Sequence, residues 1–222
     1  MTPKRISAGS RPVTGPVGAH AEIRVVIVTM DSHLASAAQR AMRGLSDVMP
    51  GLRLVVHAAA EWGGDPSALA RCQSDIAHGD IIVATMLFME EHFLPVLPDL
   101  KARRDDCDAM VCAMSAGEVM KLTRMGKFRM DAAASGPMAM LKRLRGKPEA
   151  KSEASGARAS AGAQQMKMLR RLPKILRFIP GTAQDVRAYF LTLQYWLAGS
   201  EANIAAMVHF LVDRYADGPR KP

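Results

Sequence analysis

Residues 23–30, I-R-V-V-I-V-T-M, decide the fold class of this chain. The stretch is rich in β-branched residues and almost wholly apolar, which is the pattern of a parallel strand buried on both faces. Polar residues follow at once, and Asp31 or Ser32 is expected to cap a helix there. The inner face of that helix is predicted to hold Leu34, Ala37, Ala38, Ala41, Met42 and Leu45. A buried strand leading directly into an amphipathic helix indicates the start of a βαβ unit.

The alternation of strand and helix continues as far as Gly126. Further strands are predicted at residues 52–57, 80–85 and 109–113. Asp65 and Pro66 have the N-cap and N1 chemistry of a helix between the first two of these. Residues 115–118, S-A-G-E, form a capping-box pattern for a helix that ends near Gly126. We therefore predict an α/β fold, with a mostly parallel sheet of about four strands and helices on both faces, followed by a C-terminal all-helical segment.

The composition of the chain divides it into four segments. Residues 1–21 mix Pro, Gly and Ser with basic residues and are expected to form a disordered leader. Residues 22–145 are predicted to be an α/β head domain of flavodoxin-like architecture. Residues 146–162 lack core-forming side chains, which predicts a flexible linker. Residues 163–222 show only helical patterns and are expected to form a helical neck segment, in which Ser200 caps the last helix.

The charge of the chain is uneven. The formal net charge is +9, and residues 101–180 hold 18 Lys and Arg against 7 Asp and Glu. Such a block meets nucleic acid, an anionic membrane surface or an acidic partner protein, or else it forms a solvated face. Within it, residues 166–179 combine basic residues at helical spacing with an apolar face. Pro173 interrupts this basic amphipathic pattern.

Cysteine usage and hydropathy predict a cytoplasmic protein. The three cysteines (Cys72, Cys107 and Cys112) form no Cys-x-x-Cys pair, which argues against a disulfide framework and a structural zinc site. No apolar run approaches the roughly 20 residues that a membrane-spanning helix needs. We therefore expect a reducing compartment and at most peripheral contact with a membrane.

The carboxyl ends of the predicted strands are the usual place for a ligand in an open parallel sheet. Here they comprise residues 30–33, 85–88 and 114–115. Neither a Gly-x-Gly-x-x-Gly motif after the first strand nor a phosphate-binding P-loop occurs, which argues against a nucleotide role. These residues are interpreted as turn and capping residues. We assign no catalytic residue and no metal ligand, and cofactor-binding residues stay unassigned.

Three further groups have chemistry that could suggest a site. His33, with Asp31 nearby, is interpreted as a hydrogen-bonded structural residue in preference to a metal ligand or a base. Residues 90–92, E-E-H, point in different directions on a helix and are interpreted as its solvated start. The clustered methionines are assigned mainly to the core, although thioethers also suit a flat apolar ligand or a partner surface. That cluster comprises Met86, Met89, Met110, Met114, Met120, Met125 and Met130.

Several stretches resemble the N-terminal region of the large H subunits of magnesium chelatase, in their purple-bacterial form. They are R-V-V-I-V-T-M-D-S-H-L-A-S-A from Arg24, T-M-L-F-M-E-E-H-F from Thr85 and C-D-A-M-V-C-A-M-S-A from Cys107. L-T-R-M-G-K-F from Leu122 follows, and the longest stretch begins M-L-R-R-L-P-K-I-L-R-F-I-P-G-T from Met168. Together these stretches extend over most of the chain from residue 24 onward, with residues 146–162 matching least.

The resemblance implies a role in bacteriochlorophyll synthesis. In that family, protoporphyrin IX is bound by the complete large subunit while two ATPase-type subunits use ATP to drive insertion of Mg²⁺. Members are several times longer, and their porphyrin cavity lies beyond the region that this chain matches. We therefore expect an accessory fragment without catalytic chemistry of its own. A fragment of this kind is also expected to expose apolar residues of its last helices, namely Ile204, Met207, Phe210 and Leu211.

The residues leave other functions open. The chain could instead be a stand-alone porphyrin or small-molecule module, in which Arg and Lys pair with propionates. It could also belong to a cobaltochelatase-type large subunit, or be a basic interaction protein that binds polyanions with steep salt dependence. If the chain is an accessory fragment of a magnesium chelatase H subunit, its expected partners are the remainder of the large subunit, the two ATPase-type subunits and protoporphyrin IX. Nucleic acid is not among the expected partners.

Overall fold

The computed structural model describes residues 22–131 and 182–218 as helices packed around one sheet. Six strands follow the order β2-β1-β3-β4-β5-β6. The first four strands are mutually parallel, and β5 and β6 form an antiparallel hairpin beside β4. The strand bounds are β1 Ile23–Thr29, β2 Leu52–Ala58, β3 Ile81–Thr85, β4 Ala109–Ala113, β5 Arg124–Met125 and β6 Phe128–Arg129.

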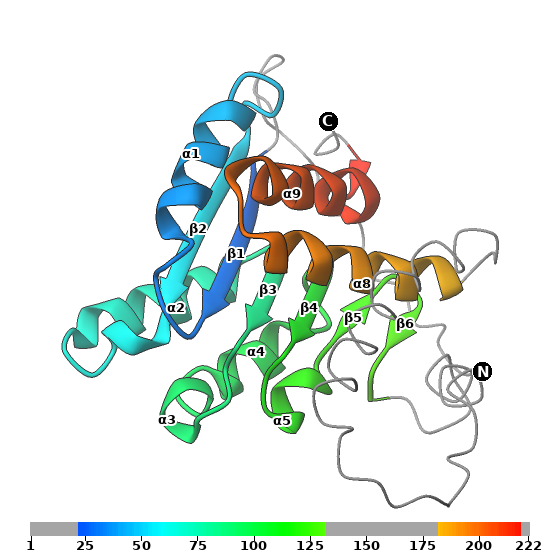
Figure 1. Cartoon of the computed structure of the whole chain (residues 1–222). Helices are drawn as coiled ribbons and strands as arrows, with labels where there is room; N and C mark the ends of the chain where they lie inside the picture. Colours follow the sequence, from blue (N-terminus) through cyan, green and yellow to red (C-terminus); the bar gives the residue numbers. More distant parts are fainter. Residues whose placement is uncertain (1–21, 132–181, 219–222) are drawn as a thin grey trace, which may run out of the picture.

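Helices cover both faces of this sheet (Figure 1). The helices α1, α8 and α9 pack on one face, and α2, α3, α4 and α5 supply the core of the other. A short 3-10 helix, η1, follows β2. The helix bounds are α1 Ala35–Leu45, η1 Ala59–Glu61, α2 Pro66–His78, α3 Glu90–Phe93, α4 Leu97–Arg103, α5 Gly117–Met120, α8 Thr182–Ala198 and α9 Glu201–Tyr215.

The central strand β1 explains why both faces need helices. Val25 and Ile27 point into the core beneath α1, α8 and α9, whereas Val26 and Val28 point into the core beneath α2 and α4. All four side chains are completely buried. Burying each contributes about 1.5–3 kcal/mol relative to leaving it exposed. The predicted α/β fold with a mostly parallel sheet and helices on both faces is confirmed, but the sheet has six strands where about four were predicted, because the β5–β6 hairpin adds two antiparallel strands.

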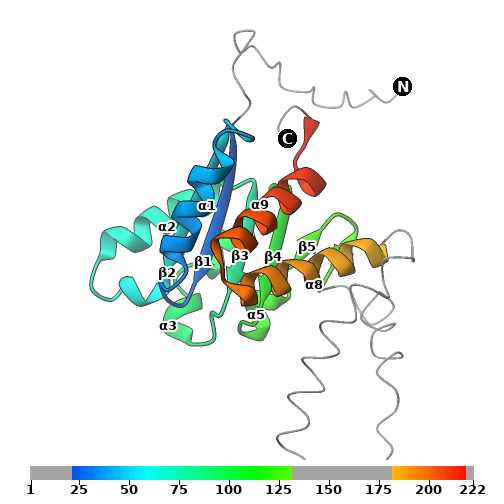
Figure 2. The ribbon, with the colours of Figure 1, turned by 45° about the horizontal axis from the view of Figure 1, so that its top comes forward.

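The C-terminal helices lie directly on the sheet (Figure 2). α9 contacts α1, α8 and β3, and α8 contacts β6, so residues 182–218 of the predicted neck segment share one core with β1. The expectation that Ile204, Met207 and Leu211 are exposed is wrong, because all three are fully buried in this core. Phe210 is half-buried. The helices α1 and α8, together with β3, cover the apolar side of α9.

The hairpin β5–β6 replaces the long helix that was predicted to end near Gly126. α5 ends at Met120, and Ser115 does not cap it. Instead, Ser115 Oγ accepts a hydrogen bond from the Leu87 backbone and donates one to the Ala113 carbonyl. Thr123 Oγ1 in turn bridges the amide and carbonyl of Cys112. These polar side chains attach the chain to β4, and tertiary pairing overrides the local helical pattern.

Helix capping was predicted correctly for some helices and wrongly for α1. The Asp65 carboxylate accepts from the Ser67 amide at the start of α2, and Ser200 Oγ accepts from Asn203 at the start of α9, both as expected. In α1 the N-cap position is Leu34, without a side-chain cap, so the prediction of Asp31 or Ser32 is wrong. Asp31 binds His33 instead.

Several predicted segments fall outside the described residues. They are the leader at 1–21, the linker at 146–162 and the basic amphipathic stretch at 166–179. Among the helices of residues 22–131 and 182–218, none has the length and apolar character needed to span a membrane.

Candidate functional site at the carboxyl edge of the sheet

The sheet grows from β1 in two directions, first to β2 on one side and then to β3 on the other. The carboxyl ends of β1 and β3 are therefore the topological switch point of the sheet. Ligands of open α/β sheets bind in the crevice outside such a point. The loops there comprise residues 30–34 after β1, 86–89 after β3 and 114–116 after β4. Figure 1 shows α3 and α5 next to one another where β3 and β4 end.

Two methionines at this edge have left-handed backbone. Met86 has φ of 61° and Met114 has φ of 45°, and they follow the last residues of β3 and β4. Positive φ is uncommon for residues other than glycine, and such strain is concentrated at functional sites. The two loops are fastened to each other, because Leu87 donates to Ser115 Oγ at 3.1 Å and the Ala116 amide donates to the Leu87 carbonyl at 2.9 Å. This cross-bonding holds both strained residues in place.

Two buried threonines end the strands that flank the switch point. Thr29 and Thr85 are each 1% exposed, and their hydroxyl oxygens lack a hydrogen-bond partner among the described residues. The parallel register pairs Val28 with Ala84, so the two threonines follow at the same level. Leaving a buried hydroxyl unpaired costs about 1–3 kcal/mol. No sequence pattern indicates this feature, because burial depends on the tertiary packing around the strand ends.

Asp31 and His33 are brought together as the sequence suggested. His33 Nδ1 hydrogen-bonds to Asp31 Oδ1, and the His33 backbone amide donates to the same oxygen. The side-chain hydrogen bond, followed by the backbone one, lowers the pKa of Asp31 below its usual range. Both side chains are exposed to solvent, so the pair forms a turn on the surface rather than a closed site.

The structure does not gather the other candidate residues around one point. Glu90 and Glu91 begin α3 and are exposed, and His92 is half-buried beside them. Within residues 22–131 and 182–218, no group of three His, Cys, Asp or Glu side chains could hold a metal ion. The methionine cluster divides, because Met110 and Met125 are fully buried core residues whereas Met89 is exposed. Met86, Met114, Met120 and Met130 are half-buried.

The exposed apolar side chains at this edge include one that the sequence analysis missed, Leu94, whereas Phe88 lies within the strand-end residues 85–88 named there. Phe88 is 56% exposed and Leu94 is 50% exposed, and Met89 between them is 51% exposed. The exposure of Phe88 and Met89 has a signal in the sequence, since both stand immediately before two glutamates. An apolar residue beside a predicted solvated helix start is a candidate for exposure.

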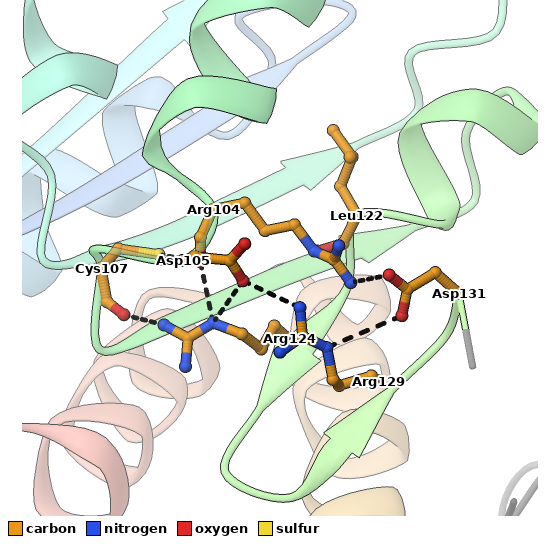
Figure 3. A network of polar contacts seen from close by, with 7 residues as sticks. All are labelled: Arg104, Asp105, Cys107, Leu122, Arg124, Arg129 and Asp131. Carbon is orange, nitrogen blue, oxygen red and sulfur yellow. Dashed lines mark hydrogen bonds and ion pairs between the residues drawn. The ribbon is translucent and has the colours of Figure 1, made fainter.

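A network of arginines and aspartates lies at the other end of β4 (Figure 3). Arg104 pairs with Asp131 at 2.6 Å, and Arg129 pairs with Asp105 at 2.8 Å. Arg124 donates to the carbonyls of Arg104 and Cys107, as Figure 3 shows. Burial opposes ionisation of Asp131, but the hydrogen bond and charge of Arg104 outweigh it and hold the pKa of Asp131 below its usual range. These basic residues fasten the β5–β6 hairpin to the end of α4.

The three cysteines are free and buried. Burial raises the pKa of Cys72 to about 12 and also raises that of Cys112 and Cys107. A thiol with such a pKa carries almost no thiolate at neutral pH, which removes its nucleophilicity. The cysteines therefore behave as core residues.

Comparison with known proteins identifies the class of the chain. The family model described as a domain of unknown function (DUF3479) matches residues 24–190, and the chain belongs to this family. Among curated proteins it is 47% identical over 204 residues to the magnesium-chelatase H subunit of Cereibacter sphaeroides, covering 92% of this chain and 16% of that protein. It is 48% identical over 193 residues to the H subunit of Rhodobacter capsulatus, covering 87% of this chain and 16% of that protein.

A more distant relative with a matching name occurs in plants. The chloroplastic ChlH subunit of the magnesium chelatase of rice is 28% identical over 197 residues, which cover 87% of this chain and 14% of that protein. The resemblance drawn from the sequence motifs is therefore confirmed: the chain is similar to the purple-bacterial H subunits over most of its length. It spans 16% of the length of the two bacterial relatives.

Proposed function

We propose that this chain is the head region of the H subunit of a magnesium chelatase, where it serves assembly of that large subunit and access to its porphyrin site without inserting metal itself. The observation that carries the proposal is 47% identity to such a subunit over 92% of the chain, confined to 16% of the relative's length. Identity of this extent also speaks against the stand-alone module, the cobaltochelatase and the polyanion-binding interpretations. Protoporphyrin IX, Mg²⁺ and ATP belong, on this proposal, to the complete complex.

The arrangement of the described residues supports an accessory role. The two cores of the described region are filled by its own helices, since α1, α8 and α9 cover one face of the sheet and α2 and α4 cover the other. Insertion of Mg²⁺ calls for oxygen ligands and for a base that removes two pyrrole protons. The exposed glutamates at the carboxyl edge belong to the starts of three different short helices, which suits contact with another surface better than coordination of an enclosed ion.

The proposal is tested with a hybrid of the Cereibacter sphaeroides H subunit in which this chain replaces the matching region. Magnesium protoporphyrin IX is measured by its fluorescence, in the presence of ATP, Mg²⁺, protoporphyrin IX and the two ATPase-type subunits. We expect the hybrid to insert Mg²⁺, a large subunit without the region to lose most of the activity, and the chain alone to form no product.

Two outcomes would contradict the proposal. Magnesium insertion by the chain without the rest of the large subunit would show that the head is catalytic. Full activity of the large subunit that lacks the region would show that the head serves neither assembly nor access. The soluble fraction and the far-ultraviolet circular dichroism of each variant serve as the folding control.

A further inference from the structure

The carboxyl edge carries a concentration of exposed apolar side chains. In the described part of the chain five large apolar residues are strongly exposed, and three of them (Phe88, Met89 and Leu94) lie in or beside α3. We call these three, with the half-buried Met86, the carboxyl-edge patch. Clustered exposed apolar residues mark interaction sites, whereas single ones are ordinary.

The backbone beneath the patch is held firmly. Met86 and Met114 are fixed in left-handed conformations by hydrogen bonds between the two loops. η1 packs against α3, and the Ala60 amide donates to the Met30 carbonyl at 2.9 Å, which joins the loops after β1 and β2. A surface that is ordered before binding loses less conformational entropy when a partner docks. Its methionine side chains remain able to adapt to the shape of that partner.

The charges around the patch are mainly negative, although the chain as a whole is basic. Glu61, Glu90, Glu91 and Glu118 lie on the loops and helix starts of this edge and are exposed. Within the described residues none of the four takes part in an ion pair. The basic residues near them in sequence are the half-buried His92, which follows Glu91 in α3, and Lys121, at the end of α5. The formal net charge of the whole chain is nevertheless +9.

This combination of charge and apolarity selects one kind of partner. Carboxylates around an apolar patch repel nucleic acid and anionic lipid, so neither is a suitable ligand. An amphipathic helix with cations on its polar face can place its apolar face on the methionines and its cations beside the glutamates. We propose that the carboxyl-edge patch docks a basic amphipathic helix of a partner protein. This inference goes beyond the proposed role in magnesium chelatase and rests on the surface alone.

Binding is measured with the full chain and a fluorescein-labelled peptide of about 18 residues, long enough for several helical turns. The peptide has Leu on one helical face and Lys and Arg on the other, and its fluorescence anisotropy is followed during titration. A scrambled peptide of the same composition and a peptide with Glu in place of the cations are the controls. We expect saturable binding of the first peptide only, which weakens as salt is raised.

Variants of the chain locate the site. Phe88→Ser and Leu94→Ser are each expected to weaken binding about tenfold, as truncation of a central anchor does. Glu90→Gln combined with Glu91→Gln is expected to weaken binding and to flatten its salt dependence. The matched control is Val48→Ser, which removes an exposed apolar side chain from the loop that precedes β2, at the amino edge of the sheet, and should leave binding unchanged.

The proposal is overturned if the scrambled or acidic peptide binds equally well, if the patch variants bind as the parent does, or if no saturable binding occurs. A further variant tests a different occupant, the chain's own basic stretch. Its cations are replaced by Gln at Lys167, Arg170, Arg171, Lys174 and Arg177. If only this variant binds the peptide, the chain's own segment occupies the patch and docking of a partner protein is refuted. Metal insertion by the hybrid is measured separately, so failure of one proposal leaves the other standing.

Discussion

The carboxylate of Asp185 in α8 lies 3.0 Å from the backbone nitrogen of Lys127 in the β5–β6 turn and accepts its hydrogen bond. The same carboxylate accepts from Arg214 at 3.0 Å and from the Tyr215 hydroxyl at 3.1 Å. Asp185 is buried, and these donors offset the cost of removing its carboxylate from water. One side chain thereby joins the hairpin to both C-terminal helices and helps to fix them on the sheet.

Replacement of Gly126 should disrupt this junction. A Cβ at this position would lie 2.8 Å from Asp185 Oδ2, and the residue has φ of +55°. Gly126→Ala is therefore expected to lower the free energy of unfolding by about 1–3 kcal/mol, measured by urea denaturation. Gly44→Ala is the control, because Gly44 lies within α1 with nothing near its added Cβ. A gain of about 0.5–1 kcal/mol is expected there, and equal losses in both variants would contradict the prediction.

Removal of the Asp185 carboxylate should cost more than removal of an exposed ion pair. Asp185→Ala leaves the Lys127 amide and the Arg214 guanidinium without their acceptor, and a loss of about 2–3 kcal/mol is expected. Arg40 and Glu201 form the comparison, since their exposed pair also ties α9 to the rest of the chain, through α1. Arg40→Ala is expected to cost under about 1 kcal/mol. Similar losses in the two variants would show that Asp185 has no special role.

The four parallel strands could be predicted from the sequence because their residues are buried wherever the sheet is covered on both faces. β1 is an example, since its uninterrupted apolar run needs no knowledge of the partner elements. The β5–β6 hairpin could not be predicted in the same way. Its strands are two residues each, too short for a periodic pattern, and their position depends on Thr123 and Arg124 binding the backbone of distant residues.

The location of the candidate site is a prediction from the sequence, whereas its backbone geometry is seen only in the structure. The rule for parallel sheets placed it at the ends of β1, β3 and β4. The left-handed backbone of Met86 and Met114 has no sequence signal, because methionine does not favour positive φ. The apolar face of α9 was wrongly predicted to be exposed for a related reason. An apolar face indicates that a helix packs against something, but the sequence does not say which surface covers it.

Hydrogen bonds at the start of α2 lower the pKa of the Asp65 carboxyl group. The Ser67 hydroxyl, followed by Arg71, lowers the pKa of Asp65 from 3.8 to about 2. Because the folded pKa is the lower one, the ionised carboxylate stabilises the fold above the unfolded pKa, and this contribution is lost as pH falls through about 2. Ser67→Ala is expected to return the pKa toward 3.8, followed by NMR of the carboxyl carbon. Ser46→Ala, at the end of α1, should leave it unchanged, and an unaltered pKa in Ser67→Ala would contradict the assignment.

The buried thiols should report global unfolding. Since burial raises the pKa of Cys72 to about 12 and also raises that of Cys112, neither thiol is expected to react with a disulfide reagent in the folded chain near neutral pH. Labelling, monitored by mass spectrometry, should rise with denaturant in parallel with the circular dichroism signal. The unfolded chain, in which all three cysteines react, is the positive control. Rapid labelling of Cys72 before unfolding would show that α2 opens locally.

The left-handed backbone of Met86 is expected to disfavour a β-branched side chain at this position. Met86 has φ of 61°, a conformation that crowds a branched Cβ, so Met86→Val is expected to destabilise the chain by about 1–3 kcal/mol. Met86→Asn should be milder, because Asn tolerates this region better. Met89 is the matched control: it is exposed and extended, with φ of −91° and ψ of 146°, a geometry that suits valine. Met89→Val should change the free energy of unfolding by less than about 0.5 kcal/mol. Equal effects at both positions would mean that Met86 is free to leave its strained conformation, and that the loops after β3 and β4 are not fastened together.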